Sequence, residues 1–201
     1  MVLYRNWITR KNNPILIDMA YLTTPSVIFP LDPYRVTGAP FGKRAEHNGV
    51  FWGVHLGEDC DVPTGTDVRA IGHGTVVYAA LHPGTEEKGN WGHIVIIRHK
   101  RPRSKEVFYS LYAHLGTSFK RIGEKVSGGE PLGFIGEGFT PENGYWAPHL
   151  HFAIYVGPWQ DEVLPGYWKE GETRTRPQWW RVPSEFIRAY NVPPMLKKTA
   201  E

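Results

Sequence analysis

The sequence has little cysteine and no long hydrophobic run. Cys60 is the single cysteine in 201 residues, so no disulfide can form within the chain. We therefore expect a reducing compartment, or export of a protein that is stabilised by other means. No apolar run reaches the roughly 20 residues of a membrane span, and no signal peptide is visible. These absences predict a protein with no membrane span.

Charge of one sign is also scarce. The formal net charge is +3, and the densest basic run, residues 98–105, lies between two apolar segments. Such a run is typical of a solvated hairpin loop rather than of a nucleic-acid-binding surface. We expect no nucleic-acid partner, and the sequence leaves the oligomeric state open.

Glycine, proline and aromatic residues are abundant. The chain has 22 glycines and 17 prolines, and 13% of its residues are aromatic. This composition favours short strands joined by tight turns over long helices. The runs rich in β-branched and aromatic residues are "FWGVHLG", "GTVVYAA", "HIVIIRH", "VFYSLYAHL", "PLGFIGEG" and "HLHFAIYV". We predict a mainly β fold, an antiparallel sheet or open barrel-like sandwich with few short helices.

The composition divides the chain into three parts. Residues 1–32 form an N-terminal arm of mixed character, and residues 33–160 form the domain that carries the β signals. Residues 161–201 are rich in tryptophan and proline, and we predict that they pack on this domain as an extension. One short helix is expected there, in "PSEFIRAY", with Ser184 capping its N-terminus.

The stretch "PHLHFAIYV" places His149 and His151 on one face of a strand, about 7 Å apart. The two imidazoles could share a metal ion, or one could bind the metal while the other faces a substrate. Taken alone, this pair more often marks an exposed polar face of a sheet. The spacing does not decide which of the two histidines would bind a metal.

A second stretch, "HLGEDCDVPTGTDV", offers His55 and Asp59. On a flat strand their side chains would lie about 13 Å apart, too far for one ion. We therefore expect a bend, which Gly57 permits. Glu58 and Asp61 are competing carboxylates, although alternation turns Glu58 away from His55. The alternative is a turn whose charges lie in water.

A third stretch, "YSLYAHLG", adds His114, predicted to lie on the same strand face as Tyr112. Two histidines and one aspartate from such segments would leave a zinc ion with one open coordination position. That arrangement is typical of catalytic zinc, since structural sites usually have four ligands rich in cysteine. No His-Glu-x-x-His motif is present. The alternative for His114 is an ordinary histidine at the end of an apolar strand.

The order of these motifs resembles that of the lysostaphin-type zinc metallopeptidases, which are peptidoglycan endopeptidases. The resemblance covers roughly residues 36–156, and the glycine and proline framework around the histidines makes it specific. The matching segments are "APFGKR" (39–44), "HLGEDCDVPTGTDVRAIGHGTVVYA" (55–79), "NWGHIVIIRH" (90–99), "LYAHL" (111–115), "RIGEKVSGGEPLGFIGEGF" (121–139) and "PHLHFAI" (148–154).

The resemblance implies that His55, Asp59 and His151 bind zinc, while His114 and His149 stay off the metal as catalytic groups. Residues 33–160 would then be the zinc metallopeptidase catalytic domain, with the lysostaphin-type fold. The chain departs from the family by having Glu, Cys and Asp at positions 58, 60 and 61. Tyr112 could hydrogen-bond substrate, although packing in the core is the alternative.

The activity implied is hydrolysis of peptide bonds in bacterial peptidoglycan cross-links or bridges by a zinc-activated water. The protein would then act at the bacterial cell wall, and a phage-derived lysis enzyme is compatible with the sequence. The alternative is a non-catalytic zinc-binding regulator of wall hydrolases with the same fold. Such regulators typically lose metal ligands, whereas all five positions are filled here.

Overall fold

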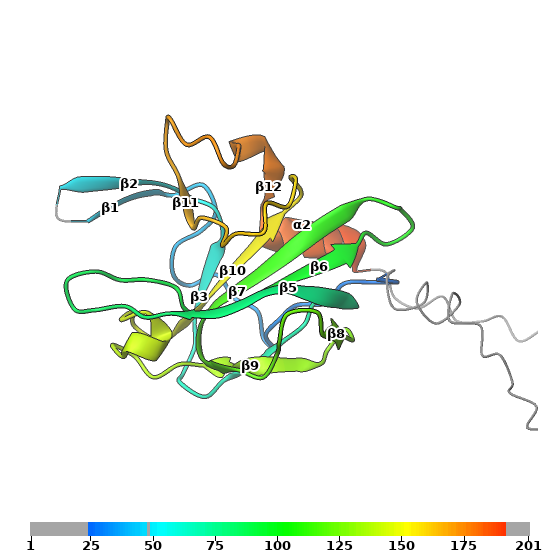
Figure 1. Cartoon of the computed structure of the whole chain (residues 1–201), viewed down its shortest axis with the longest axis horizontal. Helices are drawn as coiled ribbons and strands as arrows, with labels where there is room; N and C mark the ends of the chain where they lie inside the picture. The colour runs from blue at the N-terminus through cyan, green and yellow to red at the C-terminus, as the bar shows by residue number, and fades with distance from the viewer. Residues whose placement is uncertain (1–23, 48, 192–201) are drawn as a thin grey trace, which may run out of the picture.

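The computed structural model describes residues 24–47 and 49–191, and this part of the chain is mainly antiparallel β structure with one α-helix (Figure 1). No helix within it is long and apolar enough to cross a membrane. The elements are β1 (Arg44–His47), β2 (Val50–His55), β3 (Glu58–Asp61), β4 (Asp67–Arg69), β5 (Gly74–His82), β6 (Gly92–Lys100), β7 (Val107–Ser118), β8 (Lys125–Val126), β9 (Pro131–Ile135), η1 (Pro141–Asn143), β10 (His149–Tyr155), β11 (Tyr167–Trp168), η2 (Pro177–Trp179), β12 (Trp180–Arg181) and α2 (Pro183–Tyr190).

The strands form two sheets. The larger has nine strands in the order β12-β10-β7-β6-β5-β8, with β3 paired to β10, and β9 paired to β7 and β4. The smaller sheet has the order β1-β2-β11, and its β1–β2 hairpin projects beyond the larger sheet (Figure 1). The larger sheet does not close on itself. The mainly β, open antiparallel fold predicted from the sequence is confirmed, including the long β6–β7 hairpin.

Strand β6 shows why the sheet holds together. Its residues alternate between two cores: Val95 and Ile97 pack in one, and Ile94 and Ile96 in the other. All four side chains are fully buried, and burying each stabilises the fold by about 1.5–3 kcal/mol. A central strand covered on both faces reads as a continuous apolar run, which explains the sequence "HIVII".

Residues 161–191 contribute elements to both sheets. β11 pairs with β2, β12 pairs with β10, and α2 packs Phe186 and Ile187 into the first core. The predicted helix is confirmed, but its predicted cap is wrong. The N-cap residue is Val182, and the Ser184 hydroxyl instead donates a hydrogen bond to Glu58 Oε1. The division into arm, domain and extension stays a prediction, and residues 1–23 and 192–201 lie outside the described residues.

Candidate metal centre and catalytic groove

His55 and Asp59 meet because the chain changes sheets between them. His55 ends β2 in the smaller sheet, and Asp59 lies in β3 of the larger sheet. Their side chains approach to 3.4 Å between His55 Nε2 and Asp59 Oδ1, so the predicted bend exists. Gly57 is needed there for space: a Cβ would lie 2.7 Å from His151 Cε1 and from Nε2, and its φ is outside the left-handed region.

The register of β10 brings His151 to the same point. His151 lies opposite Asp59 in the antiparallel β3–β10 pair. Its Nδ1 atom is 3.0 Å from Asp59 Oδ1 and 3.0 Å from His55 Nε2. The three residues are buried, and their candidate ligand atoms all lie within 4.8 Å of one another. This cluster has the size and the donor types of a site for one metal ion.

The electrostatics of the cluster suit a cation. Burial lowers the pKa of His151 to about 4, despite the hydrogen bond and charge of Asp59, so the imidazole is neutral at pH 7. Burial tends to raise the pKa of Asp59, but hydrogen bonds with His151 and His55 outweigh it and hold that pKa below its usual range. His151 therefore offers a neutral imidazole and Asp59 an anionic carboxylate, the protonation states that bind metal.

The competing carboxylates lie elsewhere. Glu58 is buried and points away from the cluster, where Tyr34 Oη donates to it at 2.7 Å and the Ser184 backbone N–H at 2.9 Å. Asp61 is exposed, and its backbone N–H donates to Thr37 Oγ1. Alternation along β3 thus assigns Glu58 correctly, and Asp59 is the carboxylate of the cluster.

His114 reaches the site through a β-bulge. Between two paired positions, Val95 with Tyr112 and His93 with Leu115, β7 has one residue more than β6. His114 lies in this extra segment with a φ of 64°, and its ring centroid is 4.4 Å from that of His149. Burial and the neighbouring imidazoles lower its pKa well below the usual value. A bulge re-aims a side chain in this way because it shifts the alternation.

Because of the bulge, the prediction that Tyr112 lies on the same strand face as His114 is wrong. The sequence places Tyr112 and His114 on one face, but Tyr112 is fully buried in the core. Its hydroxyl accepts hydrogen bonds from the Ile71 backbone N–H at 3.0 Å and from Ser110 Oγ at 2.9 Å. Tyr112 therefore lies in the core, away from the groove, and it packs there instead of contacting a substrate.

His149 lies at the edge of the cluster. Its Nε2 atom is 4.0 Å from Asp59 Oδ1, and its Nδ1 atom is 2.7 Å from the Ala147 carbonyl oxygen. Because a carbonyl oxygen can only accept, Nδ1 carries a proton in this hydrogen bond. The half-buried side chain faces the groove together with His114.

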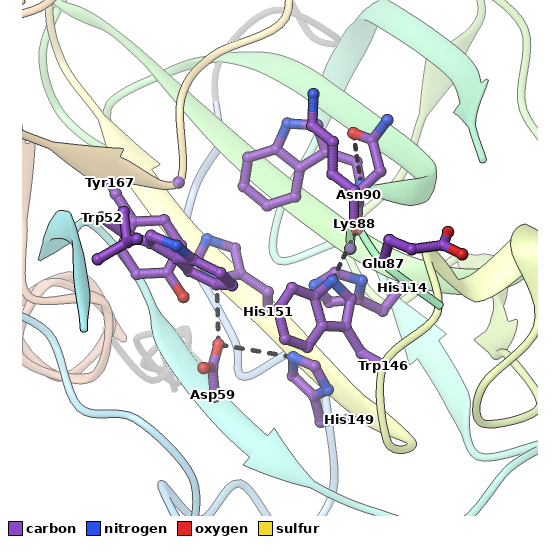
Figure 2. Close-up of a pocket in the computed structure, with 14 residues that line it drawn as sticks. Trp52, Asp59, Glu87, Lys88, Asn90, His114, Trp146, His149, His151 and Tyr167 are labelled. Carbon is purple, nitrogen blue, oxygen red and sulfur yellow. Dashed lines mark hydrogen bonds and ion pairs between the residues drawn. The ribbon is translucent and has the colours of Figure 1, made fainter. Parts of the chain in front are cut away.

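Aromatic side chains form the walls of a pocket of about 600 Å³ above the cluster. Figure 2 shows Trp52 and Tyr167 on one side of the Asp59–His151 pair, and His114 and Trp146 on the other. No local pattern in the sequence predicts these walls, because they come from separate segments and join the site through tertiary contacts. The aromatic residues that line the pocket are Trp52, Trp91, Trp146 and Tyr167.

Comparison with known proteins identifies the family. The family model described as Peptidase family M23 matches residues 53–163, more than half of the chain. The chain belongs to peptidase family M23. The M23 match contains the three residues of the cluster and both additional histidines, while Tyr167 lies outside it.

Several M23 relatives are similar in sequence or fold. The DD-carboxypeptidase/endopeptidase Mpg of Neisseria meningitidis is 33% identical over 130 residues, which cover 64% of this chain and 26% of the relative. The peptidoglycan DD-endopeptidase ShyA of Vibrio cholerae is 32% identical over 126 residues, covering 62% and 24%. The structure of lysostaphin from Staphylococcus simulans matches the fold with a TM-score of 0.53 at 20% identity, covering 89% of this chain and 59% of that one. The chain spans about a quarter of the length of these curated relatives.

Proposed function

We propose that the protein is a zinc metalloendopeptidase that hydrolyses peptide bonds of bacterial peptidoglycan cross-links or bridges. The observation that carries the proposal is the convergence of His55 Nε2, Asp59 Oδ1 and His151 Nδ1 beneath an open pocket in a member of family M23. The names of the relatives as peptidoglycan endopeptidases support the substrate. Such a substrate would place the activity at the bacterial cell wall.

The residues present fit a zinc ion. His55 donates its Nδ1–H to the Pro40 carbonyl oxygen, 3.2 Å away, which leaves Nε2 free to bind a metal. Two imidazole nitrogens and one carboxylate oxygen are the donor types that zinc prefers, and three protein ligands leave a position open. Zinc held by His55, Asp59 and His151 would lower the pKa of a water and polarise the scissile carbonyl group.

His114 and His149 are placed to move the proton. His114 donates its Nδ1–H to the Asn143 carbonyl oxygen at 2.9 Å. His149 donates its Nδ1–H to the Ala147 carbonyl oxygen at 2.7 Å. In the neutral form of each imidazole, Nε2 is then the proton acceptor. In the proposed reaction one of these imidazoles takes the proton of the attacking water and gives it to the leaving amine nitrogen.

Metal content and hydrolysis of purified peptidoglycan test the proposal together. We expect His151→Ala to lose bound zinc and hydrolysis, and His149→Ala to keep zinc and lose hydrolysis. His73→Ala, outside the groove, is the matched control and should behave as wild type. Equal loss of zinc in the His149 and His151 variants would refute the ligand assignment, and a wild-type protein without zinc or hydrolysis would refute the function.

A further inference from the structure

We propose that Tyr167 is a catalytic residue whose phenolic O–H donates a hydrogen bond to the oxygen of the scissile carbonyl group as negative charge develops on it. This inference rests on the proposed function and deepens it. Tyr167 belongs to β11, beyond residues 53–163 that match the family model. The segment after the family match would thus complete the active site.

Pairing of β11 with β2 positions the Tyr167 ring. Tyr167 lies opposite His55 in the antiparallel register. Its ring centroid is 5.3 Å from that of His55, at an interplanar angle of 40°, and 5.9 Å from the Trp52 ring. Since the strand pairing fixes the backbone and two rings flank the side chain, the phenol is held in place before a substrate binds.

The phenol faces the groove. Tyr167 lines the same pocket as Asp59, His149 and His151, and Figure 2 shows it across that pocket from His114. A tyrosine hydroxyl has an ordinary pKa of about 10, so it keeps its proton at neutral pH. Within the described part of the chain, no residue forms a hydrogen bond with this hydroxyl. It is therefore free to bond a substrate.

The histidines of the site do not account for a hydrogen-bond donor to the oxygen of the scissile carbonyl group. Three imidazoles that approach the groove, those of His55, His114 and His149, each direct their Nδ1–H to a backbone carbonyl oxygen. The Trp146 indole N–H likewise donates to the Asn90 carbonyl oxygen at 2.9 Å. These N–H groups already have backbone acceptors. A developing oxyanion needs a donor, and the phenol of Tyr167 supplies one.

The proposed hydrolysis has two steps, addition of water and release of the amine. The water oxygen forms a bond to the carbonyl carbon, the carbonyl π pair moves to the oxygen, and an imidazole takes the proton of the water. The Tyr167 hydroxyl strengthens its hydrogen bond to this oxygen and keeps its own proton. The carbonyl then re-forms, the carbon–nitrogen bond breaks, and the imidazole gives its proton to the amine nitrogen.

Tyr167→Phe tests the inference, since it removes the hydroxyl and keeps the ring beside His55. For a soluble cross-linked muropeptide we expect kcat to fall by about 100-fold, with KM within about twofold of wild type. Bound zinc should stay unchanged. Affinity for a phosphinate peptide, whose tetrahedral oxygens imitate the transition state, should fall about as much as kcat. Tyr78→Phe, whose hydroxyl instead contacts His82, is the matched control.

Three results would overturn the inference while leaving the proposed function intact. These are a kcat for Tyr167→Phe within about threefold of wild type, an equal loss of affinity for substrate and phosphinate, and a loss of zinc. The second would mean ground-state binding, and the third would mean that the phenol only supports His55. Absence of hydrolysis by the wild-type protein would overturn the proposed function and the inference with it.

Discussion

The contact between Gly57 and His151 gives a quantitative prediction. In Gly57→Ala, the new Cβ would lie 2.7 Å from His151 Cε1, from His151 Nε2 and from the Phe152 carbonyl oxygen. Ordinary contact begins at 3.4 Å, so the imidazole has to move by about 0.7 Å. The carbonyl oxygen belongs to β10 and cannot move independently of the strand.

The displacement is large for a metal site. Ligand distances in such sites hold to about 0.2 Å, so a shift several times larger would disrupt the proposed coordination of zinc by His151. We expect zinc affinity to fall by about 10–100-fold, the range for changes that disturb ligand orientation. Overpacking also destabilises the metal-free fold by about 1–3 kcal/mol. Chelator competition measures the first effect, and urea unfolding of the metal-free protein the second.

Gly128→Ala is the control, because the three atoms nearest to its Cβ would be backbone atoms of Gly72, the closest of them Cα at 3.2 Å, and none belongs to a candidate ligand. This variant should bind zinc as wild type does. If Gly57→Ala bound zinc within threefold of wild type, the idea that close packing on the glycine orients His151 would be wrong.

Two predictions concern the stability of parts of the fold outside the candidate metal centre. Burial lowers the pKa of His99 from its ordinary value of 6.5 to about 4 in the folded protein. Below pH 6.5 the unfolded chain therefore binds a proton at His99 that the folded protein does not bind. The free energy of unfolding therefore falls as pH decreases from 6.5 toward 4. Between pH 7 and 5 His99 accounts for a loss of about 2 kcal/mol. His99→Gln should make the free energy of unfolding in urea less dependent on pH by about this amount. Ser184→Ala removes a hydrogen bond to the buried Glu58 carboxylate and should cost about 1.5–3 kcal/mol with kcat unchanged. An unaltered unfolding midpoint in Ser184→Ala, or an unaltered pH slope in His99→Gln, would count against these assignments.

The sequence predicts those parts of the site that depend on local pattern. Alternation along "PHLHFAIYV" places His151 in a strand, and the separation of His55 from Asp59 requires the bend that the structure has. The same alternation fails for Tyr112 and His114, because one inserted residue in β7 shifts the period of two. The inserted residue can be recognised only from the pairing of β7 with β6.

Other features depend on partners that are distant in the sequence. Ser184 has the residue type and position of a helix cap, but the buried Glu58 carboxylate binds its hydroxyl instead. Tyr167 lies in a segment without strong strand signal, and it reaches the groove because β11 pairs with β2. Such choices depend on competition between partners in the folded protein, which a local pattern does not contain.

The two sheets share the candidate metal centre unequally. One donor, His55, comes from the smaller sheet, and the other two come from adjacent strands of the larger sheet. A cation bound by all three would cross-link the layers at the point where β11 supplies Tyr167. Depleting the ion would then loosen the β1-β2-β11 layer, so the apoprotein would lose one side of its groove along with its electrophile.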